Sequence, residues 1–303
     1  LDPTADHFTL LHFIAALPGS REPIRLVVRR GTPITYPIAF IVQIPAAHLS
    51  DASWIQDETE ESDPIDWAKS APQAGAVPAV THVFLLIGQS NMAGRGPVGA
   101  EDRTPDPRVF ALGQDRQWHP AVDPLAFDKP ELVGVGPGLA FGKAVARAHP
   151  DWVVGLVLSP FGGSSLDEWR PGGRLYGDAI ARAQAALAGG GRLEAILWHQ
   201  GESDAKPELA MTYVARFQLF AASLRHDLGA PAVPLIAGEI GRFVAGGESI
   251  NRQLALLPSA VPHCRLVSSA GLTDKGDHLH FDSPSARELG RRYAAAFAAG
   301  ADR

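Results

Sequence analysis

The strongest constraint on the fold is a repeated alternation, from residue 82 onward, of short apolar runs with longer alanine-rich amphipathic stretches. Each short run is continuously apolar, which is typical of strands covered on both faces in a parallel sheet. The expected strands are 82–87, 152–158, 193–198, 233–237 and 265–268. Alternating strands and helices predict an α/β protein with three α/β/α layers, a five-stranded parallel sheet and right-handed crossovers.

The stretches between the apolar runs carry helix start and stop signals. Pro137 lies in the first turn of one stretch, where its missing N–H costs nothing, and that stretch ends before Pro150. Three glycines at 189–191 mark the end of a second amphipathic stretch. The expected helices are 137–147, 175–187, 207–228 and 284–299.

Residues 1–78 do not share this pattern. They contain strand-like runs at 24–28 and 38–44, an acidic patch at 57–63 and a linker with two prolines at 71–78. We interpret residues 1–78 as a small β-rich extension, or alternatively a partly ordered tail, joined to a main domain at 79–303. The acidic patch lacks the spacing of metal ligands and is interpreted as a solvated surface.

Composition excludes several classes of partner. The formal net charge of −6 gives no phosphate-seeking surface, so we do not expect nucleic acid to bind. The single cysteine, Cys264, excludes an internal disulfide and a cysteine-rich zinc cluster, and its apolar surroundings predict a buried strand position. No stretch approaches the ~18 apolar residues of a membrane span. Oligomeric state leaves no signal in the sequence.

The compartment is not fixed by the sequence. Residues 8–17 are apolar, but they form a short run that follows acidic residues, which is atypical of a signal peptide. The chain starts at Leu1 rather than Met, which leaves open whether a leader was removed or never included. A secreted or periplasmic location is favoured over a cytoplasmic one.

Active sites of open α/β sheets lie beyond the carboxyl ends of the strands, so the residues that follow each apolar run are the candidates for function. The first run leads into residues 88–94, GQSNMAG. Ser90 in this turn would have an exposed hydroxyl beside free backbone N–H groups that suit an oxyanion. It is either a nucleophile or an ordinary helix cap. The segment is not a Gly-x-Ser-x-Gly elbow, because Met92 replaces the second glycine.

The second and third runs also lead into candidate residues. Gly162 and Gly163 follow the second run, and such a pair either lets a backbone N–H approach a ligand or simply forms a turn. The third run leads into residues 199–204, HQGESD. Gln200 could aim its amide at an oxyanion, or the whole segment could form a structural network.

Near the C-terminus, Asp277 and His280 have a spacing that allows a carboxylate to orient an imidazole base. The alternative is a metal site formed by Asp277, His278 and His280, which is disfavoured because no other His or Cys cluster has matching spacing. His278 lacks a carboxylate three residues upstream and is interpreted as a neighbour of the site.

Together these four segments resemble the SGNH hydrolase superfamily, in its sialate O-acetylesterase and acetylxylan esterase branch (carbohydrate esterase family six). The resemblance covers roughly the last three-quarters of the chain and implies a flavodoxin-like fold. It implies Ser90 as the nucleophile, His280 as the general base and Asp277 as its orienting carboxylate. The implied oxyanion hole comprises the backbone N–H groups of Ser90 and Gly163 and the side chain of Gln200.

The resemblance implies a serine esterase that removes O-acetyl groups from carbohydrates, such as acetylated xylan or O-acetyl sialic acid, through an acetyl-enzyme without metal or cofactor. The alternatives are a short-chain carboxylesterase or lipid deacylase with the same triad, and a catalytically inactive glycan-binding module. Trp169 and Trp118 either stack on sugar rings or belong to the core. Candidate substrate-binding or supporting residues are Gln89, Asn91, Gly162, Glu202 and Trp169.

Overall fold

A computed structural model describes residues 13–15, 24–26 and 78–300 of the chain. By its internal contacts the chain divides into residues 1–73 and 74–303, and each unit is described by itself. In the first unit, β1 (Phe13–Ala15) and β2 (Ile24–Leu26) pair antiparallel. β2 falls within the strand expected at 24–28, whereas the run at 38–44 and the acidic patch lie outside the described residues. The extension boundary at residue 78 stays a prediction.

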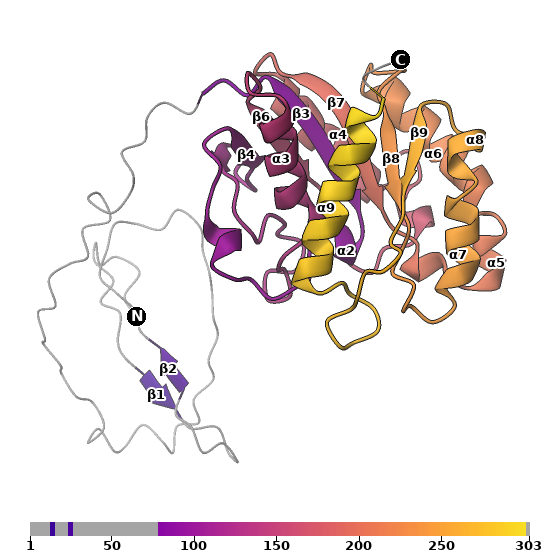
Figure 1. Cartoon of the computed structure of the whole chain (residues 1–303), viewed down its shortest axis with the longest axis horizontal. Coiled ribbons are helices and arrows are strands. Elements are labelled where there is room, and N and C mark those ends of the chain that lie inside the picture. The colour runs from indigo at the N-terminus through magenta and orange to yellow at the C-terminus, as the bar shows by residue number, and fades with distance from the viewer. Residues whose placement is uncertain (1–12, 16–23, 27–77, 301–303) are drawn as a thin grey trace, which may run out of the picture. The chain divides into compact units, whose positions relative to one another are not determined.

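The second unit is built on one seven-stranded sheet (Figure 1). Its strands are β3 (His82–Gly88), β4 (Val109–Leu112), β5 (Trp118–Pro120), β6 (Val154–Leu158), β7 (Arg192–His199), β8 (Leu235–Gly238) and β9 (Cys264–Val267). Their order across the sheet is β5-β4-β6-β3-β7-β8-β9, and only the β4–β5 pair is antiparallel. Cys264 is buried in β9, as expected.

The α/β class is confirmed, but the sheet has seven strands rather than five. The five expected strands are present, and numbered among themselves they follow the order 2-1-3-4-5 of flavodoxin-like sheets. β4 and β5 extend the edge beyond β6. β4 has only four residues, and β5 is a three-residue edge strand whose last two residues are exposed, so neither produces a long apolar run.

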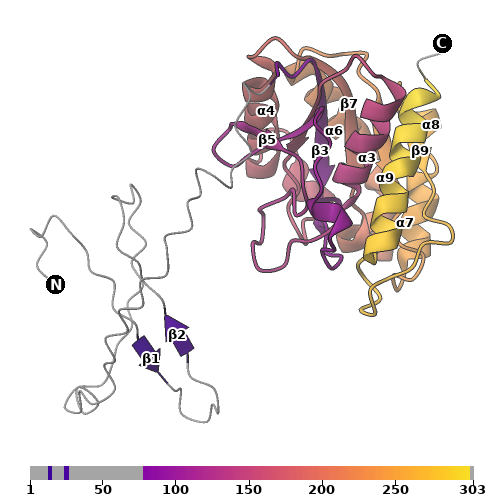
Figure 2. The same cartoon turned by 60° about the vertical axis from the view of Figure 1, so that its left-hand side comes forward.

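Helices cover both faces of the sheet. α3 (Pro137–Ala148) and α9 (Ser283–Ala298) pack together on one face, and α4 (Arg174–Leu187) and α6 (Tyr213–Asp227) cover the other. Figure 2 shows β3 between α4 and the α3–α9 pair. Alternate residues of β3 enter the two cores, since Val83, Leu85 and Ile87 join one and Phe84 and Leu86 the other.

The remaining helices are short. The helix expected at 207–228 is interrupted at residues 211–212, which separates α5 (Pro207–Ala210) from α6. The others are α2 (Ser90–Ala93), α7 (Gly247–Leu254), α8 (Leu257–Ala260) and the 3₁₀ turns η3 (Glu101–Arg103), η4 (Leu166–Trp169) and η5 (Glu202–Asp204). Within residues 78–300, no helix has the length and apolar character needed to cross a membrane.

β3 and β7 stay paired up to their carboxyl ends, where Gly88 lies opposite His199. Gly88 has φ +129, and a Cβ at this position would lie 2.1 Å from the carbonyl oxygen of His199. No residue with a side chain fits there without moving one strand away from the other. Gly88 therefore lets the two loops that follow these strands start side by side.

We predict that Gly88→Ala lowers the free energy of unfolding by about 2 kcal/mol or more, because the methyl group meets a backbone carbonyl at an unfavourable φ. The matched control is Gly177→Ala in α4, where no atom lies within 4 Å of the added Cβ. The control should gain up to about 1 kcal/mol from helix propensity. Urea unfolding of both variants measures the difference, and equal midpoints for Gly88→Ala and the wild type would contradict the close approach.

Candidate active site

Four segments meet at the carboxyl edge of the sheet: the loops after β3, β6 and β7, and the loop before α9. The loops after β3 and β7 are joined where the side chain of Gln89 accepts hydrogen bonds from the N–H groups of Gly201 and Ser203, both at 3.4 Å. The loops after β6 and β7 are joined by Ser203 Oγ, which donates to the carbonyl oxygen of Gly163 at 3.0 Å. The sequence segments expected to carry function are therefore neighbours in space.

Ser90, His280 and Asp277 form a continuous hydrogen-bonded chain. Ser90 begins α2, and its Oγ lies 3.0 Å from His280 Nε2, although the two residues are 190 positions apart. His280 Nδ1 lies 2.8 Å from Asp277 Oδ2. This geometry places a hydroxyl, an imidazole and a carboxylate in the order that nucleophilic catalysis requires.

The environment of Asp277 fixes the orientation of the imidazole. Burial disfavours its ionised form, but the backbone N–H of His280, the imidazole and the N–H of Leu279 hold the pKa of Asp277 well below its ordinary value. Ionised Asp277 can only accept, so Nδ1 of His280 carries the proton that joins them. The Nε2 lone pair of His280 therefore faces the hydroxyl of Ser90.

Two backbone N–H groups at this edge of the sheet, those of Ser90 and of Gly163 in the loop after β6, have no hydrogen-bond acceptor among the described residues. Gly163 is exposed at φ +84, with no atom within 4 Å of a virtual Cβ. Both groups can therefore donate to a ligand oxygen, as an oxyanion hole requires.

Gln200 has a different set of partners from the one that the oxyanion role needs. Its side chain is fully buried, and Nε2 donates to the Ser164 carbonyl at 3.1 Å and to Asp204 Oδ2 at 2.7 Å. Oε1 accepts from the Tyr213 hydroxyl at 2.9 Å. Reversing the amide would set an oxygen against two acceptors. In this arrangement Gln200 bridges segments of the site and presents no amide proton to a ligand.

A buried ion pair supports the loop after β6. The N–H of Gly162 donates to Asp128 Oδ2 at 2.8 Å, and Arg95 Nη2 donates to the same oxygen at 2.9 Å. Both side chains are almost fully buried. This ion pair was not predicted from the sequence. Arg95 directly follows the GQSNMAG segment and could have been noticed there, whereas Asp128 lies in a loop without a pattern.

Trp169 belongs to the core. Its side chain is fully buried, its indole N–H donates to Ser164 Oγ at 2.9 Å, and its ring meets that of Trp198 edge-on at 5.4 Å. Of the two alternatives, the structure shows the core position, since a fully buried ring cannot stack on a sugar, and the indole N–H ties the ring to the 164–169 turn. Trp118 is partly buried in the edge strand β5, where it packs against the core.

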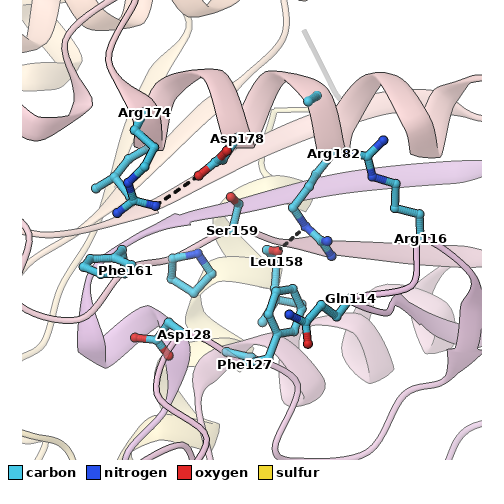
Figure 3. Close-up of a pocket in the computed structure, with 14 residues that line it drawn as sticks. Gln114, Arg116, Phe127, Asp128, Leu158, Ser159, Phe161, Arg174, Asp178 and Arg182 are labelled. Carbon is cyan, nitrogen blue, oxygen red and sulfur yellow. Dashed lines mark hydrogen bonds and ion pairs between the residues drawn. The ribbon is translucent and has the colours of Figure 1, made fainter. Parts of the chain in front are cut away.

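Beside the Gly162–Gly163 loop lies a cavity of about 310 Å³ (Figure 3). None of the three residues of the hydrogen-bonded chain lines it, but Phe161, which precedes the glycine pair, does. Arg174 covers the ring of Phe161 at 4.8 Å, and Arg182 covers that of Phe127 at 4.7 Å. The cavity therefore adjoins the site through Phe161. A guanidinium group already covers one face of each of the two phenyl rings.

Asn91 and Glu202 connect the segment after β3 to the loop after β7 and to the loop before α9. Asn91 Nδ2 donates to Glu202 Oε1 and to the carbonyl oxygen of Leu279, and its Oδ1 accepts from the N–H of Phe281. The Glu202 side chain is 2% exposed. Burial raises the pKa of Glu202 to about 7, although the Asn91 amide and nearby backbone N–H groups favour its ionised form. Burial lowers the pKa of the neighbouring His199 to about 3.

Known proteins are similar to this chain in sequence and fold. The model of a family described as carbohydrate esterase, sialic acid-specific acetylesterase matches residues 80–299. A probable carbohydrate esterase of Arabidopsis thaliana is 34% identical over 235 residues, which cover 71% of this chain and 89% of that protein. An X-ray structure of an Arabidopsis thaliana protein has a TM-score of 0.68 at 31% identity, covering 73% of this chain and 99% of that chain.

The crystal structure of NanS has a TM-score of 0.64 at 18% identity, covering 75% of this chain and 99% of that chain, which shows a common fold. The fold and the motif residues at its sheet edge define an SGNH-type hydrolase. The chain belongs to the carbohydrate esterase family of sialic acid-specific acetylesterases. It is an acetylesterase, and thus a carboxylic ester hydrolase.

The raised pKa of Glu202 predicts a pH-dependent stability. The folded state binds this proton more tightly than the unfolded chain does, so its contribution to stability is complete below about pH 4.5 and is lost as pH rises through about 7. Glu202→Gln does not titrate. Relative to the wild type, its free energy of unfolding should therefore rise by up to about 1.4 kcal/mol per pH unit across that interval.

Denaturant unfolding at pH 5, 6, 7 and 8 measures this trend. The control is Glu208→Gln, the same change at an exposed position of α5, which should track the wild type at every pH. If the free energies of unfolding of Glu202→Gln and the wild type differed by the same amount at every pH, Glu202 would have the same pKa in the folded and the unfolded chain.

Proposed function

We propose that this acetylesterase removes O-acetyl groups from carbohydrates in two steps, with Ser90 as the nucleophile, His280 as the general base and Asp277 as the carboxylate that orients it. The observation that carries the proposal is the hydrogen-bonded chain from Ser90 Oγ to His280 at 3.0 Å and on to Asp277 at 2.8 Å. The family match over residues 80–299 supports the acetyl ester as the bond that is cleaved.

In the first step, His280 Nε2 takes the proton of the Ser90 hydroxyl as Oγ attacks the acetyl carbonyl carbon. The negative charge on the carbonyl oxygen is stabilised by the N–H groups of Ser90 and Gly163, which have no other partner among the described residues. His280 then gives the proton to the departing sugar oxygen, and an acetyl-enzyme remains. In the second step, His280 takes a proton from water as the water attacks this ester, and then gives that proton to Ser90 Oγ as the acetyl group leaves as acetic acid.

Gln200 contributes indirectly in this proposal. Its amide is bonded to Ser164 and Asp204, so it holds the loops after β6 and β7 in position. Two backbone donors remain for the oxyanion. The side-chain donor that the resemblance implies would require Gln200 to exchange its bond with Asp204 or Ser164 for one to the substrate.

Ser90→Ala should lower acetate release from an aryl acetate by at least about 10³-fold. Ser90 is the nucleophile of the hydrogen-bonded triad, and neither His280 nor Asp277 replaces it in forming the acyl intermediate. The fold should be unchanged, since the substitution removes one oxygen from the surface of the site. Hydrolysis is followed spectroscopically, and circular dichroism controls for folding. Retained hydrolysis would overturn the assignment. Glycan binding without any turnover by the wild type would instead favour an inactive binding module.

Substrate class is the second point to test. The family description favours O-acetyl sialic acids, with acetylated xylo-oligosaccharides as the other class. We expect acetate release from one of these classes, and we expect an aryl acetate to be hydrolysed at least about tenfold more efficiently than the aryl butyrate, since added methylenes do not fit an acetyl-sized site. Equal or better hydrolysis of butyrate and longer esters would favour a broad carboxylesterase or a lipid deacylase.

A further inference from the structure

Asn91 holds both residues that flank His280. Its Oδ1 accepts from the N–H of Phe281 at 3.1 Å, and its Nδ2 donates to the carbonyl oxygen of Leu279 at 3.1 Å. Asn91 is the residue after Ser90 and is only 4% exposed. One amide group therefore ties the backbone on both sides of His280 to the segment that carries Ser90.

Glu202 fixes the orientation of this amide. The second proton of Asn91 Nδ2 goes to Glu202 Oε1 at 2.5 Å. If the amide turned over, its oxygen would face both this carboxyl group and the Leu279 carbonyl, and the bond from Phe281 would meet a donor. Glu202, together with Leu279 and Phe281, thus favours the orientation in which Asn91 holds the His280 segment.

Glu202 also lies beside His199, whose tautomer follows from its partners. The Tyr293 hydroxyl donates its only proton to the carbonyl oxygen of Trp198 at 2.8 Å. The contact between this hydroxyl and His199 Nδ1, at 3.1 Å, must therefore use a proton on Nδ1. Since the buried imidazole is neutral, its Nε2 carries a lone pair. This nitrogen lies 3.9 Å from Glu202 Oε1.

His199 Nε2 and Glu202 Oε2 are both buried, and neither has a hydrogen-bond partner within the described part of the chain. Two neighbouring acceptors without a donor are costly in a buried site. A proton on Glu202 supplies a donor for His199 Nε2, because Glu202 Oε1 lies 3.9 Å away and a shift of about 1 Å brings the carboxyl group within hydrogen-bond distance of the imidazole. The titratable groups that face Glu202 are His199 of β7, Tyr213 of α6 and Tyr293 of α9, and none of these supplies a positive charge.

We propose that Glu202 is a positioning residue, which as a carboxylic acid donates its proton to His199 Nε2 and through Asn91 keeps His280 aligned with Ser90. The inference rests on the proposed function, in which His280 is the base. Loss of this proton places a buried negative charge against the lone pair of His199 and disturbs the alignment of His280. The pKa of about 7 places this change near neutral pH.

The test compares Glu202→Gln and Glu202→Leu with the wild type in kcat and KM for an aryl acetate between pH 5 and 9. The glutamine amide can donate to His199 and accept from Asn91, as the acid does, so at pH 6 this variant should lose no more than about threefold in kcat. We expect the wild-type kcat to decline above about pH 7, and the Glu202→Gln variant should lack this decline. Leucine removes the acceptor of the second Asn91 Nδ2 proton and the donor to His199, and kcat should fall about 10²-fold while KM changes less than threefold.

Glu208→Gln serves as the matched surface control and should reproduce the wild-type profile. A wild-type kcat in Glu202→Leu, a loss in Glu202→Gln as large as that in Glu202→Leu, or a Glu202→Gln profile that declines like the wild type would each overturn the inference. Retained activity in Ser90→Ala overturns the proposed function instead. The two failures are thus distinguishable.

A second pair of variants keeps the test decisive if Glu202→Leu does not fold. Asn91→Asp removes the donors to Glu202 and Leu279 and sets two carboxyl groups against each other, so kcat should fall at pH 8. Adding Glu202→Gln supplies an amide donor to the new carboxylate and should recover at least about tenfold of the loss. No recovery in the double variant would overturn the role of Glu202 in orienting residue 91.

Discussion

The parallel pairing of β3 with β7 is the interaction on which the site depends. It continues to the last residue of both strands because Gly88 lets the backbone of β3 approach the carbonyl group of His199. Beyond the last paired residues, the N–H of Gln89 donates to that carbonyl oxygen at 2.9 Å. The side chain of Gln89 then accepts hydrogen bonds from the backbone of the loop after β7. Ser90 and the 199–204 segment are therefore held in place by hydrogen bonds that extend the sheet.

The imidazole is positioned in another way, since it comes from a loop rather than from a strand end. Asp277 binds the N–H groups of Leu279 and His280 as well as the ring, and Asn91 binds the residues on either side of His280. Asp282 then caps α9 through the N–H of Ser285 at 2.8 Å. The loop is thus fixed at several points along a short stretch of backbone, which a flexible connection between β9 and α9 could not provide.

These two modes of positioning explain what the sequence could and could not predict. The five expected strands and the meeting of Ser90, Asp277 and His280 follow from patterns that are local in the chain: continuous apolar runs, and polar residues directly after them or three apart. β4 is buried but only four residues long, and β5 has three residues of which two are exposed, so neither was predicted. The partners of Gln200, Asp128 and Trp169 depend on which loops meet in the fold, and residue type alone does not fix them.

Hydrogen-bond partners and burial separate supporting groups from reacting ones at this edge of the sheet. Asp204 is fully buried and accepts from Gln200, from the N–H of Leu166 at 2.8 Å and from Arg216 at 2.9 Å. Such a group rigidifies three segments at once and is not accessible to a substrate. The N–H groups of Ser90 and Gly163 can still donate a hydrogen bond, and buried atoms of Glu202 and His199 also have no partner within the described residues. These open positions support the proposed oxyanion hole and the proposed proton on Glu202.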